Sequence, residues 1–238
     1  MRVEFQIPYL DVPIDRLSKV FQETVAQKYQ MTWRINAAAN TKRIALLASK
    51  HDHALLELLW RHAEGKLEGD VVMVISNHAD LQKKVSVFDI PFHHIPVTAE
   101  TKSEAEQKLL ALLASADIDV VVLARYMQIL SSNVVQHYPN RIINIHHSFL
   151  PAFMGADPYQ QALDKGVKII GATAHYVTDE LDMGPIIEQD IVRVSHRESV
   201  IQLRDKGRDI ERVVLARALE WHLEDRIIVD GNKTIVFS

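Results

Sequence analysis

From residue 43 onward, short continuous apolar runs alternate with segments whose apolar residues recur at helical spacing. Four of the runs have the length of buried strands: RIALLA, DVVMVIS, VVVLA and IINIH. Between them, ALLELLWRHAEG and SEAEQKLLALLASA show the three-to-four-residue period of amphipathic helices. Helices that connect buried strands normally place those strands parallel in one sheet. The pattern predicts a doubly wound, mostly parallel α/β sheet.

Further elements follow the run IINIH. VKIIGATAHYV and IIEQDIVRV are predicted strands, a long helix is predicted over about residues 199–224, and RIIVDGNKTIVF is predicted to be a hairpin that turns at Asp230-Gly231. PFHHIPV, bounded by prolines, is predicted to be an edge strand. Doubly wound sheets bind ligands at the carboxyl ends of their strands. Polar residues at those ends are therefore the first candidates for a functional site.

Residues 1–38 have a different pattern. RVEFQI and MTWRI are predicted strands, and the segment between them has helical spacing. A strand–helix–strand unit of this size buries too little apolar surface to be stable by itself. We expect it to be a partial domain whose N-terminal part is missing, joined by the polar NAAANTK segment to the α/β domain that follows.

Composition excludes several classes of protein. The chain has 238 residues, 47% of them hydrophobic, and a formal net charge of −4, which argues against a nucleic-acid partner. It contains no cysteine, so disulfides and thiolate zinc sites are excluded. Neither a signal peptide nor an apolar run of the length that spans a bilayer is present, and we expect a cytoplasmic protein without a membrane partner.

The first strand–helix turn, ASKHDHA, has no glycine, and the first glycine of the chain is Gly65. Backbone N–H groups approach phosphates closely only where glycines leave room for them, so a dinucleotide site or a P-loop is improbable. His51 and His53 are candidates for a metal site, but their spacing in a loop is weak evidence. We favour solvated or capping histidines there and expect no metal.

The strand IINIH ends in two polar side chains that suit a carbonyl substrate. Asn144 and His146 point to the same side of the strand, because strand side chains alternate. The amide can donate to a developing oxyanion, and the imidazole can protonate a leaving amine. His147 points the opposite way if the strand continues, which favours a supporting role.

A second polar cluster follows the next strand, in AHYVTDELDMGP. Thr178, Asp179, Glu180 and Asp182 occupy a loop between two apolar strands. A solvated acidic turn is one interpretation of this loop. A carboxylate that lies near an imidazole would instead raise the pKa of the imidazole and orient water. Spacing alone does not decide whether Asp182 reaches His146.

Taken in order, these segments resemble the folate-dependent formyltransferase family over roughly residues 42–238. NIHHSFLPAF is similar to the Asn-x-His-x-Ser-x-Leu-Pro signature of the family, AHYVTDELDMGPII to the loop that carries its essential aspartate, and LARYMQILS to its pterin loop. The resemblance implies a Rossmann-like formyltransferase fold. It also implies a catalytic trio of Asn144, His146 and Asp182, in which Asp182 holds His146 charged and takes a proton from the attacking water.

The resemblance further implies the folate contacts, made largely through backbone groups. They are Met127, Gln128, Ile129, Leu130 and Thr178, with His147 and Ser148 supporting the catalytic groups. Simple core packing of Met127, Ile129 and Leu130 remains an alternative. The implied substrate is 10-formyltetrahydrofolate, and no cofactor beyond this folate is implied.

Transferases and hydrolases of the family differ in the acceptor of the formyl group. The resembling ribonucleotide transformylases have a glycine-rich turn where this chain has ASKHDHA, and a proline where it has His147. We therefore expect hydrolysis to tetrahydrofolate and formate, which supplies formate for purine biosynthesis and balances one-carbon pools. Transfer to glycinamide ribonucleotide or to a sugar amine, and folate binding without turnover, are the alternatives.

The resemblance also bears on the N-terminus and on assembly. Hydrolytic members begin with a regulatory ACT domain, and residues 1–38 resemble only its second half. Incomplete domains expose strand edges that favour pairing with another subunit. We expect a homo-oligomer, either a dimer or a tetramer.

Overall fold

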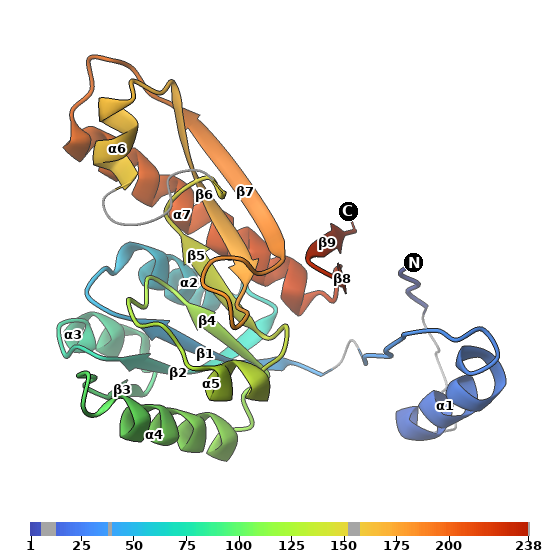
Figure 1. Cartoon of the computed structure of the whole chain (residues 1–238). Helices are drawn as coiled ribbons and strands as arrows, with labels where there is room; N and C mark the ends of the chain where they lie inside the picture. Colours follow the sequence, from blue (N-terminus) through green and yellow to red (C-terminus); the bar gives the residue numbers. More distant parts are fainter. Residues whose placement is uncertain (6–12, 38–39, 152–157, 238) are drawn as a thin grey trace. The chain divides into compact units, whose positions relative to one another are not determined.

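The computed structural model describes residues 1–5, 13–37, 40–151 and 158–237. The chain divides into two compact units, Met1–Thr41 and Lys42–Val236 (Figure 1).

The larger unit is built on one seven-stranded sheet, and it confirms the predicted doubly wound, mostly parallel architecture. The strand order is β3-β2-β1-β4-β5-β6-β7; the first five strands are parallel, whereas β6 is antiparallel to both β5 and β7. As predicted, the short strand of the PFHHIPV segment lies at an edge. The strands are β1 (Lys42–Ala48), β2 (Gly69–Ser76), β3 (Phe92–His94), β4 (Val120–Leu123), β5 (Ile142–His146), β6 (Ile169–Tyr176) and β7 (Ile186–Arg193).

Helices cover both faces of this sheet (Figure 1). Alternate residues of β1 point to opposite faces, so Leu46 packs in the core with α2 and α7, and Leu47 packs with α4 and α5. Both residues are fully buried, which explains why the strand is a continuous apolar run. The helical segments are α2 (His53–Ala63), α3 (Gln82–Val85), the 3₁₀ turn η2 (Ser86–Phe88), α4 (Lys102–Ser115), α5 (Ser132–His137), α6 (Pro158–Asp164) and α7 (Val200–Leu223).

The chain ends in the predicted hairpin, formed by β8 (Ile227–Asp230) and β9 (Lys233–Val236). Asp230 pairs with Lys233, so the turn residues are Gly231 and Asn232, one position later than the sequence indicated. Gly231 has φ +58°, a conformation that glycine adopts without steric cost.

The N-terminal unit differs from the sequence prediction. It contains α1 (Ile14–Phe21), which continues into the π-helical turn η1 (Gln22–Ala26). The predicted strand MTWRI is wrong: residues 31–37 have no regular secondary structure. Among the described residues of this unit there is no strand to pair with them; the side chain of Trp33 instead packs against Phe21, with ring centroids 4.7 Å apart. Of the predicted strand RVEFQI, residues 2–5 form no strand, and the rest lies outside the described residues.

The turn from β6 to β7 brings distant residues to the end of β5. Asn144 on β5 pairs with His175 on the antiparallel strand β6. The connection to β7 then folds back against the end of β6, where a Cβ on Gly184 would lie only 1.8 Å from the carbonyl oxygen of Tyr176. Glycine at this position therefore permits the close return that places Asp182 over the strand ends.

Candidate active site

The three residues of the predicted catalytic trio lie together at the carboxyl end of β5. Nδ1 of His146 is 3.2 Å from Oδ2 of Asp182, and the side chain of His146 is 9% exposed. Asn144 joins the same group through His175, whose Nε2 lies 3.2 Å from the Asn144 amide nitrogen and 3.5 Å from Oδ1 of Asp182. Asp182 thus reaches His146, which spacing alone left undecided.

The Asp182 carboxylate is held ionised. Hydrogen bonds from His146, first, and from His175 lower its pKa well below the usual range and outweigh the opposing effect of burial. Each carboxylate oxygen faces a histidine nitrogen. The carboxylate can therefore favour a positive charge on His146, but it is a weak base.

The other ring nitrogen of His146, Nε2, is buried and has no hydrogen-bond partner within the described ranges. Because Asp182 engages Nδ1, Nε2 is the atom that is left for a substrate. A protonated ring would present Nε2–H, a donor suited to an oxyanion or a leaving nitrogen.

His175 is a site residue that the sequence analysis missed. Its Nδ1 lies 2.9 Å from the Tyr176 carbonyl oxygen and donates to it, so in the neutral ring Nε2 accepts a hydrogen bond from the amide of Asn144. In a protonated ring, Nε2–H can donate to Asp182 instead. Either contact orients a member of the trio. Alternation along AHYV places His175 on one face of a strand, but its antiparallel pairing with Asn144 was not readable from that pattern.

His147 and Ser148, the predicted supporting residues, follow directly after β5. The Ser148 carbonyl accepts a hydrogen bond from Thr173 Oγ1 at 2.9 Å, which ties this turn to β6. The ring centroid of His147 is 5.1 Å from that of His146. Burial, followed by the positive charge of Arg125, lowers the pKa of His147 to about 4. His147 is therefore neutral at ordinary pH.

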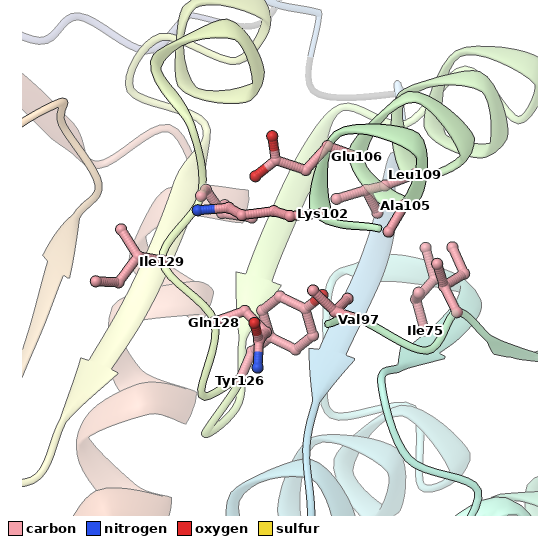
Figure 2. Close-up of a pocket in the computed structure, with 11 residues that line it drawn as sticks. Ile75, Val97, Lys102, Ala105, Glu106, Leu109, Tyr126, Gln128 and Ile129 are labelled. Atoms are coloured by element: carbon pink, nitrogen blue, oxygen red, sulfur yellow. The ribbon is translucent and has the colours of Figure 1, made fainter. Parts of the chain in front are cut away.

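Four of the five predicted folate contacts, all but Thr178, lie on an open loop after β4. Met127 and Ile129 are 57% and 60% exposed, so core packing does not explain them. Gln128, Ile129 and Leu130 line a pocket together with residues of α4 (Figure 2). The loop is attached to the end of β1, because the Met127 backbone N–H donates to Ser49 Oγ at 2.9 Å.

Thr178, Tyr126 and Leu130 differ from these exposed loop residues. Thr178 lies on the β6–β7 connection, where its hydroxyl donates to the Glu180 carbonyl oxygen at 3.2 Å. Burial raises the pKa of Tyr126, which lines the pocket, to about 12, so its phenol stays protonated. Leu130 also packs against the core, and its backbone is the part left to contact a ligand.

The histidines of the first strand–helix turn contact each other and α7. No group of three metal-ligating side chains occurs in the described part of the chain. The prediction of a solvated or capping histidine is wrong for His53, which is the first residue of α2 and is largely buried against Glu211. The sequence did not indicate this contact because α7 lies far along the chain. In the same described ranges, no helix is long and apolar enough to cross a membrane.

Comparisons with known proteins agree with this architecture. Residues 42–219 match the model of the formyl transferase family. The chain is 56% identical to a formyltetrahydrofolate deformylase of Mycobacterium tuberculosis, covering 99% of this chain and 76% of the relative, and 52% identical to that of Bacillus subtilis, covering 100% and 79%.

Solved structures of related proteins have the same fold as this chain. A formyltetrahydrofolate deformylase from Pseudomonas syringae pv. tomato has a TM-score of 0.93 at 50% identity, covering 96% of this chain and 76% of that one. Glycinamide ribonucleotide transformylase 1 from Symbiobacterium toebii has a TM-score of 0.79 at 30% identity, covering 87% and 99%. One fold thus occurs in proteins named for hydrolysis and in proteins named for transfer.

Proposed function

The chain belongs to the formyl transferase family, and on that premise we propose that it hydrolyses 10-formyltetrahydrofolate to tetrahydrofolate and formate. The observation that carries this function is its 56% identity, over nearly its whole length, to formyltetrahydrofolate deformylase. The transformylase structure reaches only 30% identity on the same fold. The chain is accordingly a hydrolase that acts on a formamide C–N bond.

In this mechanism, Asn144 and His146 stabilise the charge that develops during the reaction. Asn144 donates a hydrogen bond from its amide to the formyl oxygen as that oxygen becomes an oxyanion. The hydrogen bond to His175 orients this amide. Protonated His146 adds a second donor through Nε2 and then passes its proton to the leaving N10. The distances of 3.2 Å within the group support these roles.

Asp182 holds His146 in its protonated form. The sequence-based mechanism also made Asp182 the acceptor of a proton from water. Both of its oxygens already face histidines, so neither is left to take a proton from water. We therefore assign Asp182 to the stabilisation of His146 alone.

Folate binding belongs to the loop of Met127, Gln128, Ile129 and Leu130, with Thr178 from the facing connection. The exposure of Met127 and Ile129 supports this assignment, because ligand-contacting groups must be accessible in the empty enzyme. Recognition through backbone groups of this loop would hold the pterin while its formyl group reaches Asn144.

The proposals on cofactors, location and assembly rest on the chemistry of the reaction and on the similarity to family members. Acid–base groups and an amide donor suffice for the hydrolysis as written, so we propose that it needs no metal or organic cofactor. We further propose a cytoplasmic homo-oligomer, either a dimer or a tetramer, that supplies formate to purine biosynthesis. The ACT-like assignment of residues 1–38 stays a prediction.

The test is chromatographic measurement of tetrahydrofolate and formate from 10-formyltetrahydrofolate, with and without glycinamide ribonucleotide. We expect stoichiometric formate with no amine present. Strict dependence on the amine would identify a transferase. Binding of the folate without either product would identify a binding protein.

A further inference from the structure

A buried charged cluster lies behind the turn that follows β5. Glu211 of α7 is 2% exposed, and its Oε2 is 2.8 Å from His53 Nε2 and 3.5 Å from Arg125 Nε. Its Oε1 accepts a hydrogen bond from the Tyr159 hydroxyl at 3.0 Å. These four residues, the Glu211 cluster, come from the start of α2, the loop after β4, α6 and α7.

The backbone is adapted to this cluster. Gly207 lies one helical turn before Glu211, and a Cβ there would be 2.0 Å from the Tyr159 hydroxyl oxygen. The absence of a side chain at Gly207 thus lets the phenol cross the helix and reach Glu211. Burial of an ion pair is an inefficient way to stabilise a fold, since the desolvation cost offsets the attraction. A cluster of this kind is better explained by a role in the adjoining site.

His147 lies between the Glu211 cluster and the catalytic trio. Its ring centroid is 6.0 Å from that of Tyr159 and 5.1 Å from that of His146. The charged groups that act on it are Arg125 and Glu211 from the cluster and His146 and Asp182 from the trio. Neither ring nitrogen of His147 makes a hydrogen bond within the residues that the structure describes.

Water needs a neighbouring base to attack an amide at neutral pH, and no residue of the trio is available as that base. Asp182 is committed to two histidines, and His146 must be protonated to serve the leaving group. His147 is half-buried beside His146 and has an unshared pair on a neutral ring.

We propose that His147 holds the attacking water and accepts its proton, and that the Glu211 cluster positions the His147 ring. This inference rests on the proposed hydrolysis. Tyr159, through its ring contact with His147 and its hydrogen bond to Glu211, is the link between the two groups.

The step balances without an outside reactant. The water oxygen forms a bond to the formyl carbon while its proton moves to His147, and the carbonyl electron pair moves to the oxygen that faces Asn144. The C–N10 bond then breaks, and N10 takes the proton of His146. His147 returns its proton to neighbouring His146, and formic acid ionises to formate, which releases one proton for each turnover.

The experiment compares water with hydroxylamine, a strong nucleophile that depends less on a base. We expect His147→Gln, which keeps a polar side chain that cannot take a proton, to lower formate release about 100-fold. Formation of formohydroxamate from added hydroxylamine should fall less than about tenfold. Asn144→Ala, the matched control, should lose both reactions equally because both pass through an oxyanion.

The outcomes separate the alternatives. Equal losses of both reactions in His147→Gln, or formate release close to wild type, would overturn the assignment. If this variant does not fold, His147→Ala is assayed with added imidazole; restored formate release supports the role, and its absence overturns it. A wild-type enzyme that releases no formate without an amine contradicts the proposed function itself.

Discussion

Oδ2 of Asp182 lies 3.2 Å from Nδ1 of His146, although the two residues are far apart in the sequence. His146 ends β5, whereas Asp182 lies between β6 and β7, and the return at Gly184 closes the gap. In the proposed mechanism, the ionised carboxylate stabilises positive charge on this imidazole, which a neutral partner could not do.

Replacement of Asp182 by asparagine should therefore lower kcat for formate release by about 10²–10⁴, because the amide no longer favours the protonated imidazole. The fold should persist, since the two side chains have the same size. Glu180→Gln is the matched control, because Glu180 is an exposed carboxylate of the same connection. Steady-state kinetics that show similar turnover for both variants would contradict the role of Asp182.

The hydrogen bond between His175 and Asn144 predicts a positioning effect. His175→Phe keeps an aromatic ring but loses the nitrogen that accepts from the amide of Asn144. We expect kcat to fall about 10- to 100-fold with little change in KM, because a misplaced donor weakens the transition state more than the bound substrate. His137→Phe, at an exposed position of α5, should leave both constants unchanged. A change in KM alone would assign His175 to substrate binding.

The close approach of Tyr159 to Gly207 predicts a stability change whose sign depends on the background. Gly207→Ala should destabilise the wild-type protein by about 1–3 kcal/mol, because the new Cβ occupies the place of the phenol. In a Tyr159→Ala background, the same substitution should stabilise by up to about 1 kcal/mol through helix propensity. Denaturant unfolding measures both, and equal effects in the two backgrounds would be inconsistent with the packing described.

The pKa of His147 predicts how activity depends on pH. Burial and then Arg125 lower this pKa to about 4, so the ring stays neutral as pH falls from 7 to about 5 and becomes protonated near pH 4. The acid limb of kcat/KM should therefore lie near pH 4. Removal of the positive charge in Arg125→Gln should raise this pKa and move the limb to higher pH.

Glu211 opposes Arg125 at His147, so Glu211→Gln should move the same acid limb to lower pH. The opposite signs of the two variants distinguish an electrostatic effect from a general loss of structure. Circular dichroism across the acid limb, from about pH 3 to 7, serves as the folding control. Limbs that stay in place in both variants would show that another group limits activity in acid.

The sequence by itself determined the sheet and the part of the site at the end of β5. Each buried strand was readable because burial on both faces demands a continuous apolar run, as in β1 and β4. Asn144 and His146 could be assigned to one side of a strand end because strand side chains alternate. MTWRI failed as a strand because the pattern records local preference and does not say whether a partner strand is present.

Only the tertiary structure decided which distant groups meet. The antiparallel return of β6 placed His175 opposite Asn144, and the turn at Gly184 brought Asp182 to His146. The long helix α7, readable as a helix from its spacing, carries Glu211 against the first strand–helix turn. Periodicity reports how each segment is buried, whereas register, loop closure and helix docking depend on the whole chain. The proposed catalytic pair was therefore visible in the sequence, and the groups that orient it were not.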